Sequence, residues 1–216
     1  MDEVNYEGIA DTLKNLGLIL RGGFHPHGKD DVSASTVVLI GNAGPDLWQS
    51  FPGPDGSGNP LEDWCRKVLP PIARSLGADI LFPFDGPPYH PFMRWAQRAE
   101  GLSPSPIGPL IHPCYGLWHA YRGALLFSHE LDVPPPLSAN PCDSCVDKPC
   151  LATCPVDAFG VDGYDVLACV CHIKTPVGND CLDWGCRARR ACPIGRNYLY
   201  APEQAAFHMA AFLRNQ

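Results

Sequence analysis

The cysteines constrain this sequence more than any other feature, because they are numerous and gathered in one part of the chain. Of the 11 cysteines, only Cys65 and Cys114 lie before residue 140, and the others lie between residues 142 and 192. The stretch LDVPPPLSANP, residues 131–141, precedes this dense region, and its prolines and small polar residues are typical of a stiff linker. We therefore expect two domains, 1–133 and 134–216.

The region before the linker indicates an α/β fold. Helices are expected at three segments with apolar residues at helical spacing: 4–20, 61–76 and 91–100. Strands are expected at three short apolar or β-branched runs: 36–40, 79–84 and 117–127. Pro70 and Pro71 should break or restart the second helix. Strands that alternate with helices favour a sheet covered by helices.

Charge and hydropathy argue against several classes of partner. The net charge is −7 without a basic tract, so nucleic acid is not an expected partner. No apolar run approaches the roughly 20 residues of a membrane helix, and the N-terminal segment MDEVNYEGIADTLK lacks an apolar signal core. We expect a cytoplasmic protein, where disulfides are rare and cysteine clusters usually bind metal or perform redox chemistry.

The first cysteine run is close to that of bacterial ferredoxins. Cys142, Cys145, Cys150 and Cys154 have the spacing C-x2-C-x4-C-x3-C-P, which differs from the ferredoxin run only in its middle gap. In that run, three thiolates bind one cubane cluster, and the cysteine before the proline ligates a second cluster. A second set of cysteines should therefore follow, and it does, ending in its own Cys-Pro step at Cys192.

Crossed ligation supplies four cysteines to each of two [4Fe-4S] clusters. The first cluster takes Cys142, Cys145, Cys150 and Cys192. The second takes Cys154, Cys181, Cys186 and either Cys169 or Cys171, which leaves one thiol spare. The alternatives are a zinc site formed by the four cysteines of the first run, a redox pair at Cys142 and Cys145, and disulfides, which the missing export signal disfavours.

The order of these features resembles the corrinoid-dependent iron–sulfur reductases, the superfamily of epoxyqueuosine reductase and the reductive dehalogenases. The region before the linker is also similar to the CblC-type vitamin B12-processing protein. Segment 93–127, with its HPCYGLW turn and following strand, carries both resemblances. The stretches DVLACVCH and GNDCLDWGCRARRACP resemble the isolated cysteine and the closing cysteine run of the reductases. The resemblance covers roughly residues 30–200 and implies that Cys169 is the eighth ligand and Cys171 the spare thiol.

The resemblance implies a nitroreductase-like α/β layer, with a base-off corrinoid such as cobalamin bound against it, and a C-terminal ferredoxin-like module holding two [4Fe-4S] clusters. Asp85, in FDGPP, resembles the proton donor of related reductases, although a turn-forming Asp explains it equally well. His112, Tyr115 and Trp118 are candidates to line a corrinoid face, because flat macrocycles favour aromatic walls. The alternative is that they belong to an ordinary turn and a half-buried strand.

The expected function is that of an oxidoreductase similar to a cobalamin reductase. Electrons from a flavodoxin, ferredoxin or reductase would pass through the clusters to the corrinoid, for cobalamin reduction or removal of its upper ligand. One alternative is a ferredoxin-type carrier whose front domain docks a partner enzyme. Another is a corrinoid-dependent reductase of an organic substrate, which the short remainder after Cys192 disfavours. In the CblC-type B12-processing protein, the residue after the His-Pro step is basic and is tied to glutathione use. Here that residue is Cys114, which disfavours glutathione-dependent dealkylation.

Overall fold

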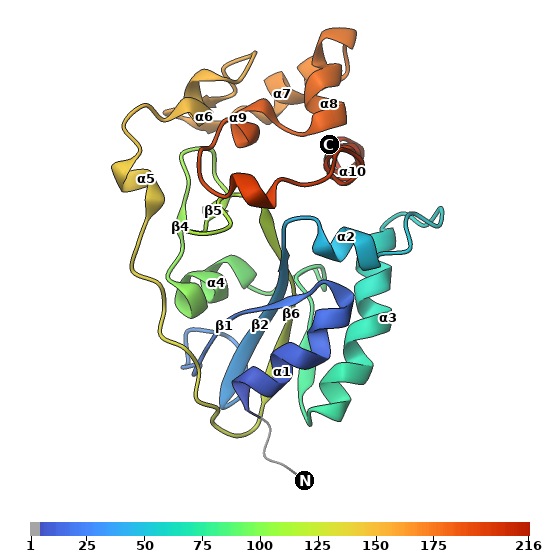
Figure 1. The fold of residues 1–216 in the computed structure, drawn as a ribbon, viewed down its shortest axis with the longest axis vertical. Coiled ribbons are helices and arrows are strands. Elements are labelled where there is room, and N and C mark those ends of the chain that lie inside the picture. Colours follow the sequence, from blue (N-terminus) through green and yellow to red (C-terminus); the bar gives the residue numbers. More distant parts are fainter. Residues whose placement is uncertain (1–4) are drawn as a thin grey trace. The chain divides into compact units, whose positions relative to one another are not determined.

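The computed structural model describes residues 5–216, and the chain divides into two compact units (Figure 1). The first unit comprises Met1–Leu102 and His119–Ser138, and the second comprises Ser103–Trp118 and Ala139–Gln216. This division differs from the expected boundary between residues 133 and 134. The linker stays with the first unit for five more residues, and the segment Ser103–Trp118 belongs with the cysteine-rich unit.

The first unit is built on a four-stranded antiparallel sheet with the order β1-β2-β6-β3. Its strands are β1 (Ile19–Phe24), β2 (Thr36–Ala43), β3 (Asp79–Leu81) and β6 (His119–Phe127). β2 is central and buried along its whole length, as its β-branched sequence favours. The strands expected at 36–40 and 117–127 are confirmed, and the one expected at 79–84 is shorter than predicted.

Four helices pack around this sheet, namely α1 (Tyr6–Leu13), α2 (Asp46–Ser50), α3 (Pro60–Ser75) and α4 (Phe92–Glu100). α1 and α4 contact β1, α2 contacts β2, and α3 contacts β3 and β6. The helix expected at 91–100 is confirmed, and it ends as predicted at Gly101, whose φ of 70° lies in the left-handed region.

Two sequence-based expectations for helices are wrong in part. The helix expected over 4–20 ends near Leu16, where Gly17 turns the chain at φ 63°, and β1 begins at Ile19. Val4 lies outside the described residues. α3 continues through Pro70 and Pro71 without a break. The carbonyls that lose their helical partners there belong to Arg66 and Lys67, whose exposure lets water replace the missing N–H groups.

The linker is attached to the first unit by hydrogen bonds that its backbone N–H groups donate. The Leu137 N–H donates to the Glu100 carbonyl over 2.9 Å, and the Leu131 N–H donates to Thr36 Oγ1 over 2.9 Å. At Gly101, a Cβ atom would lie 2.1 Å from the Leu137 carbonyl oxygen, so only glycine allows this approach. These contacts explain why the boundary lies after residue 138 and not at 133.

The second unit consists of short elements joined by turns. Its helices are α5 (Pro141–Ser144), α6 (Pro149–Ala152), α7 (Val166–Ile173), α8 (Asn179–Trp184), α9 (Arg187–Arg190) and α10 (Pro202–Arg214). Its strands form two small hairpins, β4 (Ser103–Pro104) with β5 (Leu110–Ile111) and β7 (Phe159–Gly160) with β8 (Gly163–Tyr164). The 3-10 turns are Pro176–Gly178 and Arg196–Tyr198.

The core of the second unit explains why Ser103–Trp118 belongs to it. One buried cluster combines apolar residues of that segment with cysteines of the dense region: Ile107, Ile111, Leu117, Cys150, Ala188 and Cys192. The segment therefore supplies the apolar floor on which the cysteine loops pack. The sequence instead places this segment in the first domain, residues 1–133, because it directly precedes β6 in the chain.

Candidate functional site

Four of the predicted cluster cysteines line one small cavity in the second unit. They are Cys142, Cys145, Cys150 and Cys192, and apolar side chains and prolines form the rest of the wall. Burial raises the pKa of the Cys142 thiol, and the charges of Cys192 and Cys150 raise it further, as expected for sulfurs that face a common space. The crossed scheme assigns these same four residues to the first cluster.

Local structure explains the long middle gap of the first cysteine run. Asn140 caps α5 by accepting a hydrogen bond from the Cys142 N–H over 3.1 Å. After Cys145 the chain turns outward at Val146, which is 90% exposed. Lys148 then adopts a left-handed conformation at φ 39°, and Pro149 begins α6, which carries Cys150 inward again. The two additional residues thus form a surface turn, and the thiols on either side of it line the same cavity.

A second cavity is lined by the other four predicted ligands. These are Cys154, Cys169, Cys181 and Cys186, with Phe159, Ile173 and Ala188 among the remaining wall residues. Burial is the main cause that raises the pKa of Cys169 and of Cys186. Cys171, two residues beyond Cys169 on α7, is exposed and lines neither cavity. The side-chain grouping therefore favours Cys169 over Cys171 as the eighth ligand.

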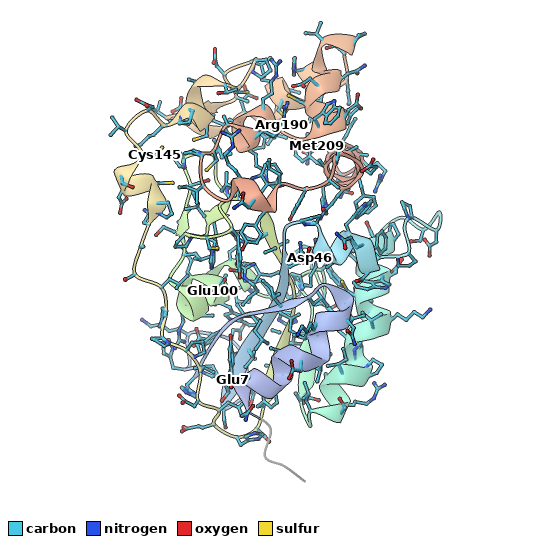
Figure 2. All side chains as sticks on the ribbon, in the orientation of Figure 1. Glu7, Asp46, Glu100, Cys145, Arg190 and Met209 are labelled. Atoms are coloured by element: carbon cyan, nitrogen blue, oxygen red, sulfur yellow. The ribbon has the colours of Figure 1, made fainter. Side chains whose placement is uncertain are left out.

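An ion-pair network fixes the turn between Cys181 and Cys186. Arg187 Nε donates to Asp180 Oδ2 over 2.7 Å, and Arg190 Nη2 pairs with the same oxygen. Arg190, labelled in Figure 2, also donates from Nε to the Gly185 carbonyl over 3.1 Å. Burial alone would raise the pKa of Asp180, but the two guanidinium groups hold it below its usual value. This network joins α8 to α9 and fixes the positions of the two cysteines.

The donor set fits two cubane clusters. Backbone N–H groups approach the sulfurs: Ala158 donates to Cys154 Sγ over 3.4 Å, and further amides face Cys186 and Cys192. Among residues 5–216, no three His, Cys, Asp or Glu side chains form a group that could hold a single metal ion. In a cubane, each thiolate binds a different iron, so its ligands surround the cluster instead of converging on one ion. Iron ligation by these residues stays a prediction.

The three aromatic candidates for corrinoid contact all lie in the second unit. His112 Nδ1 accepts hydrogen bonds from the N–H groups of Cys114 and Tyr115, over 3.0 and 3.1 Å, and its ring stacks on Tyr115 at 4.1 Å. Trp118 is 2% exposed and is covered by the Arg189 guanidinium, 4.4 Å from the ring centroid. His112 thus holds a tight turn and Trp118 packs in a core, and a corrinoid contact for them stays a prediction.

Asp85 lies in the first unit, at a turn after β3. Its carboxylate accepts a hydrogen bond from the Phe82 N–H over 3.3 Å and pairs with Arg66 Nη1 at 2.9 Å. The side chain is 38% exposed. These contacts are those of a turn-forming aspartate, and a role in proton donation stays a prediction.

Sequence reasoning missed a buried polar network in the first unit. Arg21, on β1, is fully buried and donates from Nε and Nη2 to the two carboxylate oxygens of Glu100, over 2.9 and 2.8 Å. Tyr121 also donates to Glu100, which Figure 2 labels at the end of α4, and His119 Nδ1 lies 3.1 Å from Arg21 Nη2. The partners are far apart in sequence, so no local spacing could have identified them.

The sheet and the two groups of cysteines together define the class of protein. It is a mixed α/β protein with an antiparallel sheet and a cysteine-rich second unit. Among solved structures, this fold is similar to those of epoxyqueuosine reductases and of the B12-trafficking protein CblC. The resemblance inferred from the sequence is thereby confirmed at the level of the fold. No protein-family model matches the chain, and no curated protein matches it significantly.

Three structures illustrate the similarity. Epoxyqueuosine reductase from Streptococcus thermophilus is 16% identical, with a TM-score of 0.54, over 98% of this chain and 80% of that chain. An epoxyqueuosine reductase bound to a modified tRNA-Tyr stem loop is 15% identical, with a TM-score of 0.54, over 92% and 68% of the two chains. CblC from C. elegans is 14% identical, with a TM-score of 0.52, over 96% and 95%.

Two expectations about partners meet these findings differently. In residues 5–216, no helix has both the length and the apolar character needed to cross a membrane. The expectation that nucleic acid is not a partner stays a prediction, although one structural neighbour was solved with a tRNA stem loop. That expectation now depends only on the net charge of −7 and on the lack of a basic tract.

Proposed function

We propose that this chain binds two [4Fe-4S] clusters and passes electrons through them, one at a time, to a bound corrinoid. The electrons would come from a flavodoxin, a ferredoxin or a reductase. The reaction would be reduction of cobalamin or removal of its upper ligand. The second unit would hold the clusters, and the corrinoid would bind within the expected α/β domain, residues 1–133.

The observation that carries the proposal is the division of eight cysteines between two cavities. If the four cysteines of the first run ligated one cluster, Cys154 would line the same cavity as Cys142, Cys145 and Cys150. Instead Cys154 lines the second cavity, and Cys192, from the far end of the region, lines the first. Exchange of one cysteine between two runs is the arrangement of two-cluster ferredoxins. All 11 cysteines are free thiols, which supports metal binding over disulfide formation and fits a cytoplasmic location.

The fold supports the corrinoid part of the proposal. The similarity to the B12-trafficking protein covers 96% of this chain, which includes the sheet as well as the second unit. The similarity to epoxyqueuosine reductases covers a comparable share. When bound, the clusters would supply one-electron transfer, and the corrin would supply the reactive metal. The chain itself would hold the sulfurs in place, exclude water from them with apolar walls and bind the corrin.

A cobalamin titration of the anaerobically reconstituted protein tests the proposal. The clusters are reduced with dithionite and the excess dithionite is removed by anaerobic gel filtration. Addition of hydroxocobalamin should then convert its absorption bands to those of cob(II)alamin or cob(I)alamin, while the iron–sulfur absorption returns to its oxidised form. A variant with Cys154→Ala should be slower, because it lacks a ligand of the second cluster. Cys171→Ala is the matched control and should behave as the wild type.

The alternatives predict other outcomes of the same experiment. Intact clusters with no change in the corrin bands would refute corrinoid reduction and leave a ferredoxin-type carrier. Turnover of an added organic substrate by the cobalamin-loaded protein, abolished by Asp85→Asn, would identify a corrinoid-dependent reductase instead. Zinc in place of iron after reconstitution would refute the cluster assignment itself.

A further inference from the structure

Ser105 lies in the turn between β4 and β5, and this turn uses both of its backbone polar groups. The Ser105 N–H donates to the Pro109 carbonyl over 2.8 Å, and the Ser105 carbonyl accepts from the Gly108 N–H over 2.9 Å. A proline stands on either side, at Pro104 and Pro106, and restricts the backbone further. The turn therefore fixes the place of the Ser105 side chain, and only its hydroxyl is left without an assigned role.

The Ser105 hydroxyl is enclosed by the protein. The residue is 7% exposed, and within residues 5–216 its buried Oγ atom has no hydrogen-bond partner. Buried hydroxyls are nearly always hydrogen-bonded, because the loss of their contacts with water is otherwise uncompensated. A hydroxyl can turn about its C–O bond to meet an acceptor that arrives with a bound group. The partner of Ser105 is therefore to be sought in what the neighbouring cavity binds.

That cavity belongs to the first cysteine group, the four cysteines assigned above to the first cluster. Ser105 forms part of its wall together with these four thiols. Four other wall residues are prolines, which have no N–H to donate. Apart from one exposed lysine, the remaining side chains are apolar, so along the described wall Ser105 supplies the only hydroxyl. A buried donor without an acceptor thus borders a space lined by sulfurs.

We propose that the Ser105 hydroxyl donates a hydrogen bond to a sulfur of the first cluster and thereby raises the reduction potential of that cluster. This inference rests on the proposed function, because it presupposes that the first cysteine group binds a cubane. Reduction adds negative charge to a cluster, and its sulfurs share that charge. A hydrogen bond donated to one sulfur stabilises the reduced form more than the oxidised form, so the potential rises. The apolar wall strengthens the effect, because it screens charge weakly.

A redox titration followed by EPR on the reconstituted two-cluster protein tests the inference. Ser105→Ala removes the hydroxyl and keeps the backbone of the turn. The potential of the first cluster, whose signal Cys192→Ala removes, should shift to a more negative value. The potential of the second cluster should stay unchanged and serves as an internal reference. Ser144→Ala is the matched control. Ser144 directly precedes Cys145, but it is exposed and its hydroxyl donates to the Pro141 carbonyl over 3.3 Å, so neither potential should move.

A second pair of variants keeps the inference testable if Ser105→Ala fails to retain the first cluster. Ser105→Thr and Ser105→Val introduce side chains of nearly the same shape, of which only the first has a hydroxyl. The potential of the first cluster should be more negative in Ser105→Val than in Ser105→Thr. Equal potentials in this pair, or an unchanged potential in Ser105→Ala, with two clusters present, would overturn the role of Ser105 and leave the proposed function intact. Absence of iron–sulfur EPR signals from the wild type would instead overturn the proposed function.

Discussion

Cys192 is the residue that separates crossed ligation from sequential ligation. It lies at the end of the cysteine region, yet it lines the cavity of the first run. Cys192→Ala should therefore remove the cluster held by Cys142, Cys145 and Cys150, and keep the one held by its nearer neighbours in sequence. Iron and acid-labile sulfide should fall from about eight to about four per chain, because each cubane holds four of each.

The matched control for this experiment is Cys171→Ala, which removes an exposed thiol on α7. It should leave both iron and sulfide at the wild-type value. EPR spectra of Cys192→Ala should retain the signal of the second cluster, which is the signal that Cys186→Ala removes. Loss of that signal, with the other retained, would contradict crossed ligation.

Arg21 and Glu100 form a buried ion pair in the first unit. Arg21 is fully buried, and Glu100 is its bidentate partner. Glu100→Gln would remove the carboxylate charge that pairs with the buried guanidinium, and breaking a buried pair in this way costs about 3–5 kcal/mol. Urea unfolding should show a decrease of that size in the free energy of unfolding of this unit.

An exposed ion pair in the same unit provides the comparison. Asp85 and Arg66 are about 40% exposed, with side-chain values of 38% and 43%. Asp85→Asn should therefore lower the free energy of unfolding by about 1 kcal/mol or less. Equal losses in the two variants would show that burial does not decide the strength of these pairs.

At the scale of elements, two turns of the second unit meet through a pair of glycines. Gly116 and Gly195 have φ values of 58° and 74°, and a Cβ atom on Gly195 would lie 2.2 Å from the Tyr115 carbonyl oxygen. Gly195→Ala adds left-handed strain of about 1–2 kcal/mol and forces the backbones apart. Because Gly195 closely follows Cys192, the first cluster should release its iron faster in this variant when a chelator is added.

Gly160→Ala is the control for that substitution. Gly160 is the last residue of β7 in the second unit, and a Cβ atom there would meet no heavy atom within 4 Å. Iron release from this variant should match the wild type. The same release rate in both glycine variants would mean that the contact between the two turns does not support Cys192.

Asp30 connects the loop after β1 to α4. Its carboxylate accepts a hydrogen bond from the His27 N–H over 2.7 Å, pairs with Arg98 and lies 3.3 Å from His27 Nδ1. Burial opposes ionisation, but these partners hold the pKa of Asp30 below its usual value. A lowered pKa adds stability above the unfolded-state pKa of about 4 and loses it as the pH falls through the folded-state pKa.

Asp30→Asn tests this connection. The variant should be less stable than the wild type by roughly 1–3 kcal/mol at neutral pH, the usual value of hydrogen bonds to a charged group. The difference should shrink as the pH falls below about 4. Unfolding can be followed at Trp95, whose Nε1 donates to the Asp30 carbonyl over 3.0 Å. A difference that stays constant between neutral pH and acid would contradict the prediction.

Elements with a strong local pattern were predictable from the sequence. The run TVVLI gave β2, and the apolar stretch before Phe127 gave β6, because β-branched and apolar residues favour buried strands. β1 was missed because Leu20 continues the helical spacing of α1 and two glycines follow it. Gly17 was the available signal, since a left-handed glycine often ends a helix.

The candidate site was predictable where the number of residues between cysteines determines which of them can share a cluster. Loop lengths and Cys-Pro steps predict the first group and three members of the second, Cys154, Cys181 and Cys186. They leave Cys169 and Cys171 open as the eighth ligand, and only the resemblance to the reductases favours Cys169. Trp118 was different, because its environment depends on Arg189 and Tyr200, which come from distant segments. The assignment of Ser103–Trp118 to the second unit failed for the same reason, since only packing against Cys150 and Cys192 reveals it.

At the scale of the whole molecule, the two units depend on different sources of stability. The first has a buried central strand between paired neighbours and an apolar core that includes Val38, Leu39 and Leu125. The second has strands of two residues, mostly short helices and a core in which Cys150 and Cys192 are themselves members. A unit of this kind buries little apolar surface without its metal, so cluster binding and folding should be coupled.

Removal of the clusters should therefore unfold one unit and spare the other. After anaerobic oxidation and chelation, hydrogen exchange should become fast at α7, α8 and α9, which carry or border the second group of cysteines. Backbone amides of β2 and β6 should remain protected, because they are buried and paired within the sheet. Simultaneous loss of protection in β2 and α8 would show that the units fold as one, and would contradict this division of stability.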